Sequence, residues 1–136
     1  MSSQNTSSSI EWLADGKILH VVQRGSSTRA EVDAIFDPVI HHLKHWPVGQ
    51  KLLLMWDSSS LTRINWSPHI RQRISDLLEA CPPEAYGRLA AVVSKSPVTQ
   101  IIRVFIEYEL NRRYRNREHR LFYRTDDALV WLEELL

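Results

Sequence analysis

The sequence is poor in cysteine and in glycine. It has one cysteine, Cys81, and four glycines among its 136 residues. A single cysteine can form neither an internal disulfide nor a cysteine-held metal cluster, so we expect a reducing compartment and predict a cytoplasmic protein. The sequence also lacks the glycine-rich loop that cradles phosphates in nucleotide-binding proteins.

Long apolar runs are missing too. No run approaches the roughly 20 apolar residues that cross a bilayer, so we predict no membrane span. Residues 1–9 have neither the basic start nor the apolar middle of a secretion signal, and we interpret this serine-rich stretch as a disordered lead-in. Residues 10–136 have the length of one domain.

The charge is nearly balanced, with a formal net charge of +1. The densest charge lies between residues 112 and 124, where six arginines are interleaved with tyrosines. Arginine with aromatic residues can be a footprint for RNA or for an acidic partner. Glutamates such as Glu107, Glu109 and Glu118 can pair with these arginines, so we do not expect nucleic-acid binding.

A β-hairpin is predicted at the start of the domain. Residues 10–13 and 17–22 are short apolar segments, and Asp15-Gly16 lies between them. Asp-Gly between strand-like segments is a strong hairpin signal. Thr28 and Glu31 then have the spacing of a capping box, which predicts a helix that Pro38 kinks or divides into two.

Strands and helices alternate through the rest of the chain. Residues 51–56 (KLLLMW) and 88–94 (RLAAVVS) are apolar runs too short for helices, which favours strands covered on both faces. Ser67-Pro68 and Ser96-Pro97 each supply a helix cap followed by a proline. The helix after the second pair, over residues 98–115, is expected to place Ile101 inward and to leave Glu107 in water.

This element order predicts an α/β fold. The sequence is expected to form a mixed sheet of four to five strands in the order β-β-α-β-α-β-α-β-α, with the helices packed mainly on one face. Strand-helix alternation after a hairpin favours parallel later strands joined by right-handed crossovers. A last strand over residues 118–124 and a final helix complete the pattern.

The end of the sequence resembles a known family. Residues 122–132 (FYRTDDALVWL) are similar to the ending of the SpoIIAA-like branch of the STAS superfamily, which includes anti-anti-sigma factors. The resemblance implies a STAS-like domain over residues 10–136 that acts in regulation or protein-protein interaction. It implies a protein partner, such as a kinase or an anti-sigma-like regulator, and the capacity to form a homodimer. The alternative is a module for a small apolar or anionic, lipid-like ligand, related to the CRAL-TRIO carriers.

The resemblance also indicates one candidate phosphorylation site. Anti-anti-sigma STAS proteins have a D-S-S-G motif whose serine lies at the start of a helix. The letters of residues 57–59 (DSS) match this motif, but they follow a strand directly and lie well before the helix. Ser67 occupies the position at the helix start, with Asn65, Trp66 and Pro68 replacing the other motif residues. The alternative is that Ser67 is a cap without a switch.

Several side chains are candidates for a binding surface. Asp57 and Ser58 follow the central strand, where open α/β sheets place ligands, and Lys95 and Ser96 follow the next strand. Together with Trp66 and Ser67 they could bind a partner, a phosphate or a carboxylate. The alternative is that Asp57 and Ser58 shape a turn and that Ser96 is a cap.

No enzymatic or metal site is predicted. The sequence has no Gly-x-Ser-x-Gly elbow and no matched carboxylates within one motif, so we predict a protein that is not an enzyme and needs no cofactor. His41 and His45 are spaced so that they could share a metal ion, but no further ligand supports them. Protonated histidines near a helix end also interact favourably with the helix dipole.

Overall fold

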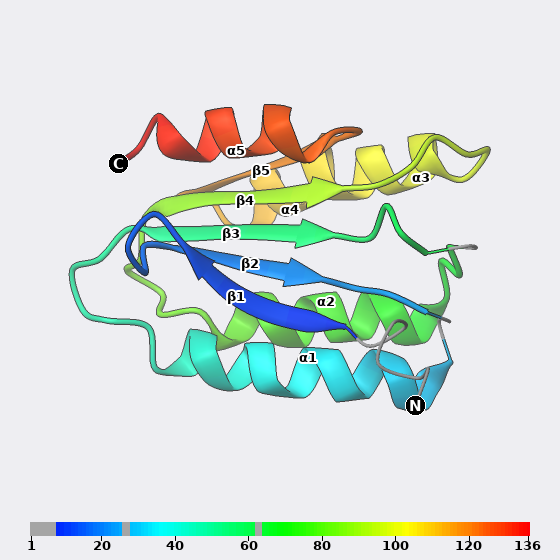
Figure 1. Ribbon diagram of the computed structural model, residues 1–136, viewed down its shortest axis with the longest axis horizontal. Coiled ribbons are helices and arrows are strands. Elements are labelled where there is room, and N and C mark those ends of the chain that lie inside the picture. The colour runs from blue at the N-terminus through cyan, green and yellow to red at the C-terminus, as the bar shows by residue number, and fades with distance from the viewer. Residues whose placement is uncertain (1–7, 26–27, 62–63) are drawn as a thin grey trace.

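One mixed sheet organises the part of the chain that the computed structural model describes, residues 8–25, 28–61 and 64–136. Its five strands lie in sequence order, and the first pair is antiparallel while the other three pairs are parallel (Figure 1). The strands are β1 (Ser9–Leu13), β2 (Ile18–Val22), β3 (Leu52–Asp57), β4 (Gly87–Val92) and β5 (Arg117–Phe122). The predicted mixed sheet is confirmed.

The helices lie mainly on one face of this sheet, as predicted. The helical segments that connect β2 to β3, β3 to β4 and β4 to β5 all pack on the same face, and the last helix packs on the other. The segments are α1 (Arg29–Lys44), α2 (Pro68–Ala80), the composite α3 (Thr99–Arg103), η2 (Val104–Glu109) and α4 (Leu110–Arg113), and finally α5 (Thr125–Glu133).

The central strand β3 separates two apolar cores. Leu52 and Leu54 belong to the larger core beneath α1, α2 and the composite segment, whereas Leu53 and Met55 belong to the smaller core beneath α5. All four side chains are buried. This burial on both faces explains why KLLLMW is continuously apolar, since successive residues of a strand point to opposite faces.

The predicted hairpin joins β1 to β2. Ala14, Asp15 and Gly16 have φ angles of 54°, 57° and 81°, and the Lys17 N–H donates to the Leu13 carbonyl at 3.1 Å. Strand β1 begins at Ser9, the last residue of the predicted lead-in, and residues 1–7 lie outside the described part of the chain.

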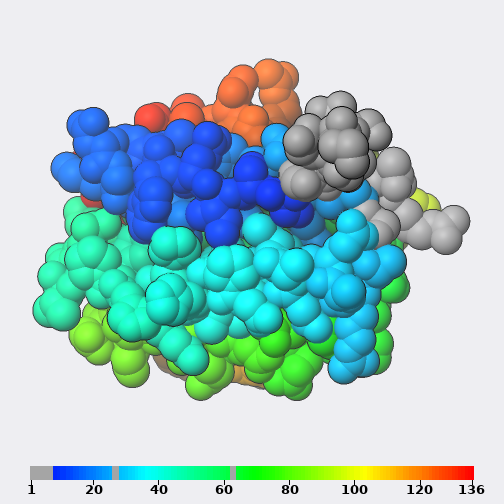
Figure 2. Space-filling model, turned by 60° about the horizontal axis from the view of Figure 1, so that its bottom comes forward, coloured from blue at the N-terminus to red at the C-terminus, as the bar shows by residue number. Residues whose placement is uncertain are grey.

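The hairpin packs against the end of α1. The Trp12 ring lies 5.5 Å from the ring of Trp46 and 5.8 Å from that of His42, measured between centroids. Figure 2 shows the hairpin and α1 side by side on this face of the molecule. The antiparallel strand at the sheet edge is thereby attached to the helical layer.

Pro38 does not divide the first helix, although this division is one of the two outcomes predicted for it. Helix α1 runs for 16 residues through Pro38, and its start has the predicted cap, in which Thr28 Oγ1 accepts the Glu31 N–H at 3.3 Å. Val39 and Leu43 are fully buried after the proline. Their burial offsets the loss of the backbone hydrogen bond that proline cannot make.

The segment between β4 and β5 contains a π-helical stretch that was not predicted. Residues 104–109 form η2 between the short helices α3 and α4. A π turn is wider than an α turn, so it changes which side chains face the sheet. Ile102 and Ile106 are buried as expected, but Ile101 is exposed, and the prediction that it points inward is wrong.

Candidate functional site

The loops after β3 and β4, and the first turns of α2 and α3, lie at the same end of the sheet (Figure 1). Asp57, the last residue of β3, is 7% exposed. Its Oδ1 atom accepts hydrogen bonds from the backbone N–H of Ser59 at 2.9 Å and from its hydroxyl at 2.5 Å. These bonds make an Asx turn, so the Asp57 carboxylate shapes the exit from the strand.

Ser58 belongs to a small polar cluster beside this turn. The Gln23 side-chain oxygen accepts hydrogen bonds from the Ser58 hydroxyl at 3.2 Å and from the Trp56 indole at 3.0 Å. The Ser58 backbone N–H donates to the Val92 carbonyl at 2.8 Å. The cluster therefore ties the ends of β2, β3 and β4 together.

Ser67 is the N-cap of α2, as the sequence indicates. Its backbone is extended, with φ −96° and ψ 162°, and its hydroxyl accepts the Ile70 N–H at 3.2 Å. Pro68 occupies the first helical position, and the first turn contains no acidic residue. The serine oxygen thus lies at the positive end of the helix dipole. Phosphorylation of Ser67 stays a prediction.

The prediction that Ser96 caps a helix is wrong. Helix α3 begins at Thr99, and its N-cap Val98 makes no side-chain hydrogen bond. The Ser96 N–H donates to Thr99 Oγ1 at 3.0 Å, and the Thr99 hydroxyl donates to the Ser94 carbonyl at 3.0 Å. Thr99 is buried and closes a turn here, and the helix cap lies at Val98, two residues after Ser96.

Lys95 is exposed, and it contacts Tyr123. Its ammonium nitrogen is 5.3 Å from the centroid of the Tyr123 ring, a cation-π arrangement on which Arg103 also converges at 5.4 Å. Asp57 bonds to Ser59 instead. The structure therefore places Asp57 and Ser58 in one turn and Lys95 against Tyr123, the residue that follows β5.

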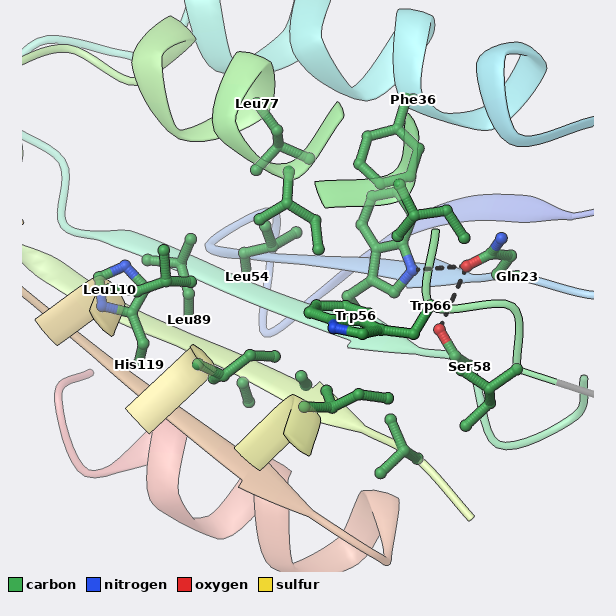
Figure 3. A pocket seen from close by; sticks show the side chains of 18 of the residues that line it. Gln23, Phe36, Leu54, Trp56, Ser58, Trp66, Leu77, Leu89, Leu110 and His119 are labelled. Carbon is green, nitrogen blue, oxygen red and sulfur yellow. Dashed lines mark hydrogen bonds between the residues drawn. The ribbon is translucent and has the colours of Figure 1, made fainter. Parts of the chain in front are cut away.

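Trp66 lies against η2 rather than in water. Its ring makes an edge contact with Phe105 at 5.2 Å, and the Arg71 guanidinium lies 5.9 Å from its centroid. Behind Trp66 is an apolar pocket of about 130 Å³ between α2, η2 and the sheet. Figure 3 shows Trp66, Phe36 and Trp56 around this pocket, with Gln23 and Ser58 at one end.

His119 lies at the other end of this pocket (Figure 3). The ring is 3% exposed, its Nδ1 atom lies 3.0 Å from the Asn111 side-chain oxygen, and its Nε2 atom has no hydrogen-bond partner among the described residues. Burial, together with the positive charge of Arg117, lowers the pKa of His119 from 6.5 to about 4. The imidazole is therefore neutral at pH 7.

Sequence reasoning missed the residues that hold His119. Asn111 accepts the His119 backbone N–H at 2.7 Å, and Glu107 accepts the Leu121 N–H at 2.9 Å. These two side chains cover the outer edge of β5, so Glu107 is not left in water as expected. Their spacing of four residues on the composite segment is the only signal in the sequence, and it does not identify the strand they bind.

Two arginines of the arginine-rich segment make contacts within the protein. Arg117 is buried and donates to the Leu78 and Pro82 carbonyls at 3.4 Å, near the end of α2, and its guanidinium lies 5.2 Å from the Tyr114 ring centroid. Arg112 pairs with Glu109 at 3.3 Å. These contacts are structural, and they account for two of the six arginines.

The outer side of the composite segment exposes three large apolar side chains. Ile101, Val104 and Tyr108 are exposed to 58%, 57% and 62% of their maximum. Steps of three and four residues place them on one side of the helical segment. We call these three residues the outer face. Phe105, the residue after Val104, contacts Trp66, which precedes α2 by two residues.

Among the described residues, no group of three histidine, cysteine or acidic side chains is placed to hold a metal ion. The His45 ring nitrogen Nδ1 lies 2.9 Å from the His41 carbonyl, as expected for a contact within one helix. Within the same described ranges, no helix is both long and apolar enough to span a bilayer.

Comparisons with known proteins bear on the fold. No family model matches the chain, and no curated protein sequence matches it significantly. The structure is similar to that of an anti-sigma factor antagonist from Mycobacterium paratuberculosis, with a TM-score of 0.64, 14% sequence identity and 93% of each chain covered. This similarity confirms the STAS-like fold that the sequence resemblance implies. It does not favour the alternative of a carrier related to CRAL-TRIO proteins.

Proposed function

We propose that this chain is a cytoplasmic regulatory domain that works by binding a partner protein and has no catalytic activity of its own. The observation that carries the proposal is the outer face, formed by Ile101, Val104 and Tyr108. Large apolar side chains gathered on one exposed face are costly in water and commonly mark sites of protein interaction. The fold, shared with a regulatory protein, supports the same conclusion.

The polar side chains at the end of the sheet support binding rather than catalysis. Asp57 is used by a turn, Ser67 by a helix cap, and Ser58 by the Gln23 cluster. The Ser59 hydroxyl donates to the Asp57 carboxylate, and the same carboxylate oxygen accepts the Ser59 backbone N–H, so this pair closes the turn. Their structural use leaves the neighbouring outer face as the surface for a partner.

Ser67 is proposed as the switch for this surface. A phosphate on its hydroxyl would meet the unpaired N–H groups and the positive dipole end of α2, and no acidic side chain in the first turn would repel it. Trp66 connects this position to Phe105 beneath the outer face. Phosphorylation by a protein kinase would therefore add about two negative charges beside the partner surface.

Site-specific photo-crosslinking in cells of the source organism tests the proposal. A photo-reactive benzoylphenylalanine replaces Val104 in one variant and Val130 in the other. Val130 is a matched control, because it is also a helical valine, is 61% exposed and lies on α5 across the sheet. We expect position 104 to capture one defined protein that position 130 does not, and we expect Ile101→Asp to abolish this capture.

The identity of the captured protein shows whether the outer face binds a second copy of the chain or a different protein. Adducts to a second copy of the chain would make the outer face a homodimer interface, and adducts to a different protein would identify the regulatory partner. Equal capture at positions 104 and 130, or capture that Ile101→Asp leaves intact, would contradict a partner surface on α3 and η2.

A further inference from the structure

We propose that the pocket beneath Trp66 binds a small apolar molecule that carries one hydroxyl group, and that this hydroxyl donates a hydrogen bond to Nε2 of His119. The proposed ligand would occupy the interior between α2, η2 and the sheet. This site is separate from the outer face, so the inference goes beyond the proposed regulatory function.

The size and lining of the pocket indicate how large and how apolar the ligand is. The pocket has a volume of about 130 Å³, and aromatic and aliphatic side chains such as Phe36, Trp56 and Leu89 form most of its wall. An engineered apolar cavity of about 150 Å³ in another protein stays dry and binds benzene. The pocket therefore suits a molecule with one ring or a short branched chain.

The hydrogen bonds of Asn111 determine the protonation of the His119 ring, which leaves Nε2 without a partner among the described residues. The Asn111 amide nitrogen donates to the carbonyls of Glu107 at 2.7 Å and His119 at 3.0 Å, so its side-chain oxygen faces the His119 ring. An oxygen acceptor requires a proton on Nδ1. In the neutral ring, Nε2 is then an acceptor with a free lone pair.

The chemistry of this lone pair indicates a hydroxyl group. An ammonium group would lose its hydration against an apolar wall, and a carboxylate offers Nε2 no proton. Buried water is held by two to four polar partners as a rule. Gln23 and Ser58 lie at the opposite end of the pocket from His119, so water beside Nε2 would lack those partners (Figure 3). A hydroxyl on an apolar body satisfies Nε2 and fills the cavity.

Two probe molecules of similar shape test the proposal. 4-Ethylphenol carries a hydroxyl where 4-ethyltoluene carries a methyl group, and the dissociation constants of both are measured by calorimetry at pH 7. His119→Phe keeps a ring but removes the lone pair. The preference for the phenol, defined as the ratio of the two dissociation constants, is expected to fall about five-fold or more in His119→Phe.

His20 provides a matched control for this substitution. Its Nδ1 atom is 2.9 Å from Glu11, its Nε2 atom is also buried without a partner among the described residues, and it does not line the pocket. His20→Phe should therefore leave the preference for the phenol unchanged. Ala91→Met places a larger side chain in the pocket wall and should weaken both probes about ten-fold.

A measurement on the unmodified protein is needed because His119→Phe could disturb the fold. The ¹⁵N resonance of His119 Nε2 should move when 4-ethylphenol is added and should stay in place with 4-ethyltoluene. The proposal is overturned if neither probe binds, if Ala91→Met does not weaken binding, or if the phenol leaves the Nε2 resonance unchanged. None of these outcomes affects crosslinking at position 104, so the two proposals fail independently.

Discussion

His119 should make the folded protein sensitive to mild acid. Burial, together with the charge of Arg117, lowers its pKa to about 4 in the folded protein, whereas the ordinary value in an unfolded chain is 6.5. Between these two values the unfolded state binds a proton more readily than the folded state. The free energy of unfolding therefore falls as the pH falls through 6.5, and this contribution levels off below about pH 4.

The size of this effect follows from the difference between the two pKa values. A difference of one pKa unit corresponds to about 1.4 kcal/mol, so the fall from 6.5 to about 4 corresponds to about 3 kcal/mol at most. Between pH 7 and pH 5 the linkage relation gives a loss of about 2 kcal/mol from His119 alone. For a domain of this size such a loss is a large fraction of the total stability.

Urea unfolding at pH 7 and pH 5 measures the loss directly. The wild-type chain should lose about 2 kcal/mol more between the two pH values than His119→Phe, which has no proton to bind at this position. A titration of the His119 ring by NMR gives the folded-state pKa independently. A titration near pH 6.5, or an equal loss in the variant, would refute the argument that the ring is held neutral in an apolar pocket.

Three further changes test other parts of the structure. Ser67→Ala should lower the free energy of unfolding by about 1 kcal/mol and Ser96→Ala by less than half of that, because only Ser67 caps a helix; equal losses by urea unfolding would contradict this difference. Gly87→Ala should cost about 3 kcal/mol or more in the same assay, because its Cβ atom would lie 1.8 Å from the Leu52 carbonyl oxygen; a loss below about 1 kcal/mol would show that the strands can separate there. Ser67→Asp should weaken crosslinking from the outer face, whereas Ser60→Asp in the exposed β3 loop should not; equal yields would argue against a switch at Ser67.

The sequence predicts the architecture well because each element has a local signal. The apolar run KLLLMW is buried on both faces of β3, Asp15-Gly16 forms the hairpin turn, and Ser67-Pro68 starts α2. These signals depend on a few neighbouring residues, so no knowledge of distant contacts is needed. Strand-helix alternation then restricts the topology to parallel crossovers, which place most helices on one face.

The errors occur where structure that the sequence motif does not encode overrides the pattern. Ser96-Pro97 resembles Ser67-Pro68 in sequence, but buried Thr99 closes a turn and moves the helix start. Ile101 fits an inward stripe for a regular α-helix. The π turn in η2 places Ile106 inward and leaves Ile101 in water. Helical periodicity alone cannot predict an inserted π turn.

The candidate site could be predicted in part. The place of Ser67 before a helix correctly predicted that it caps this helix. The place of Asp57 at the end of a strand correctly indicated that it shapes a turn. The pocket and the unpartnered nitrogen of His119 depend on Asn111, which is close to His119 only because β5 lies beside the composite segment. A single histidine on a strand does not indicate in the sequence that its ring will bond to Asn111.

The most direct test of the central claim, a partner surface on the outer face, is the affinity of the crosslinked partner for two charged variants. Val104→Glu and Val130→Glu place the same charge at equally exposed valines on opposite sides of the sheet. The proposal predicts a dissociation constant at least ten-fold higher for Val104→Glu, about 1.4 kcal/mol, and no change for Val130→Glu. An unchanged affinity for Val104→Glu, or an equal loss for both variants, would contradict it.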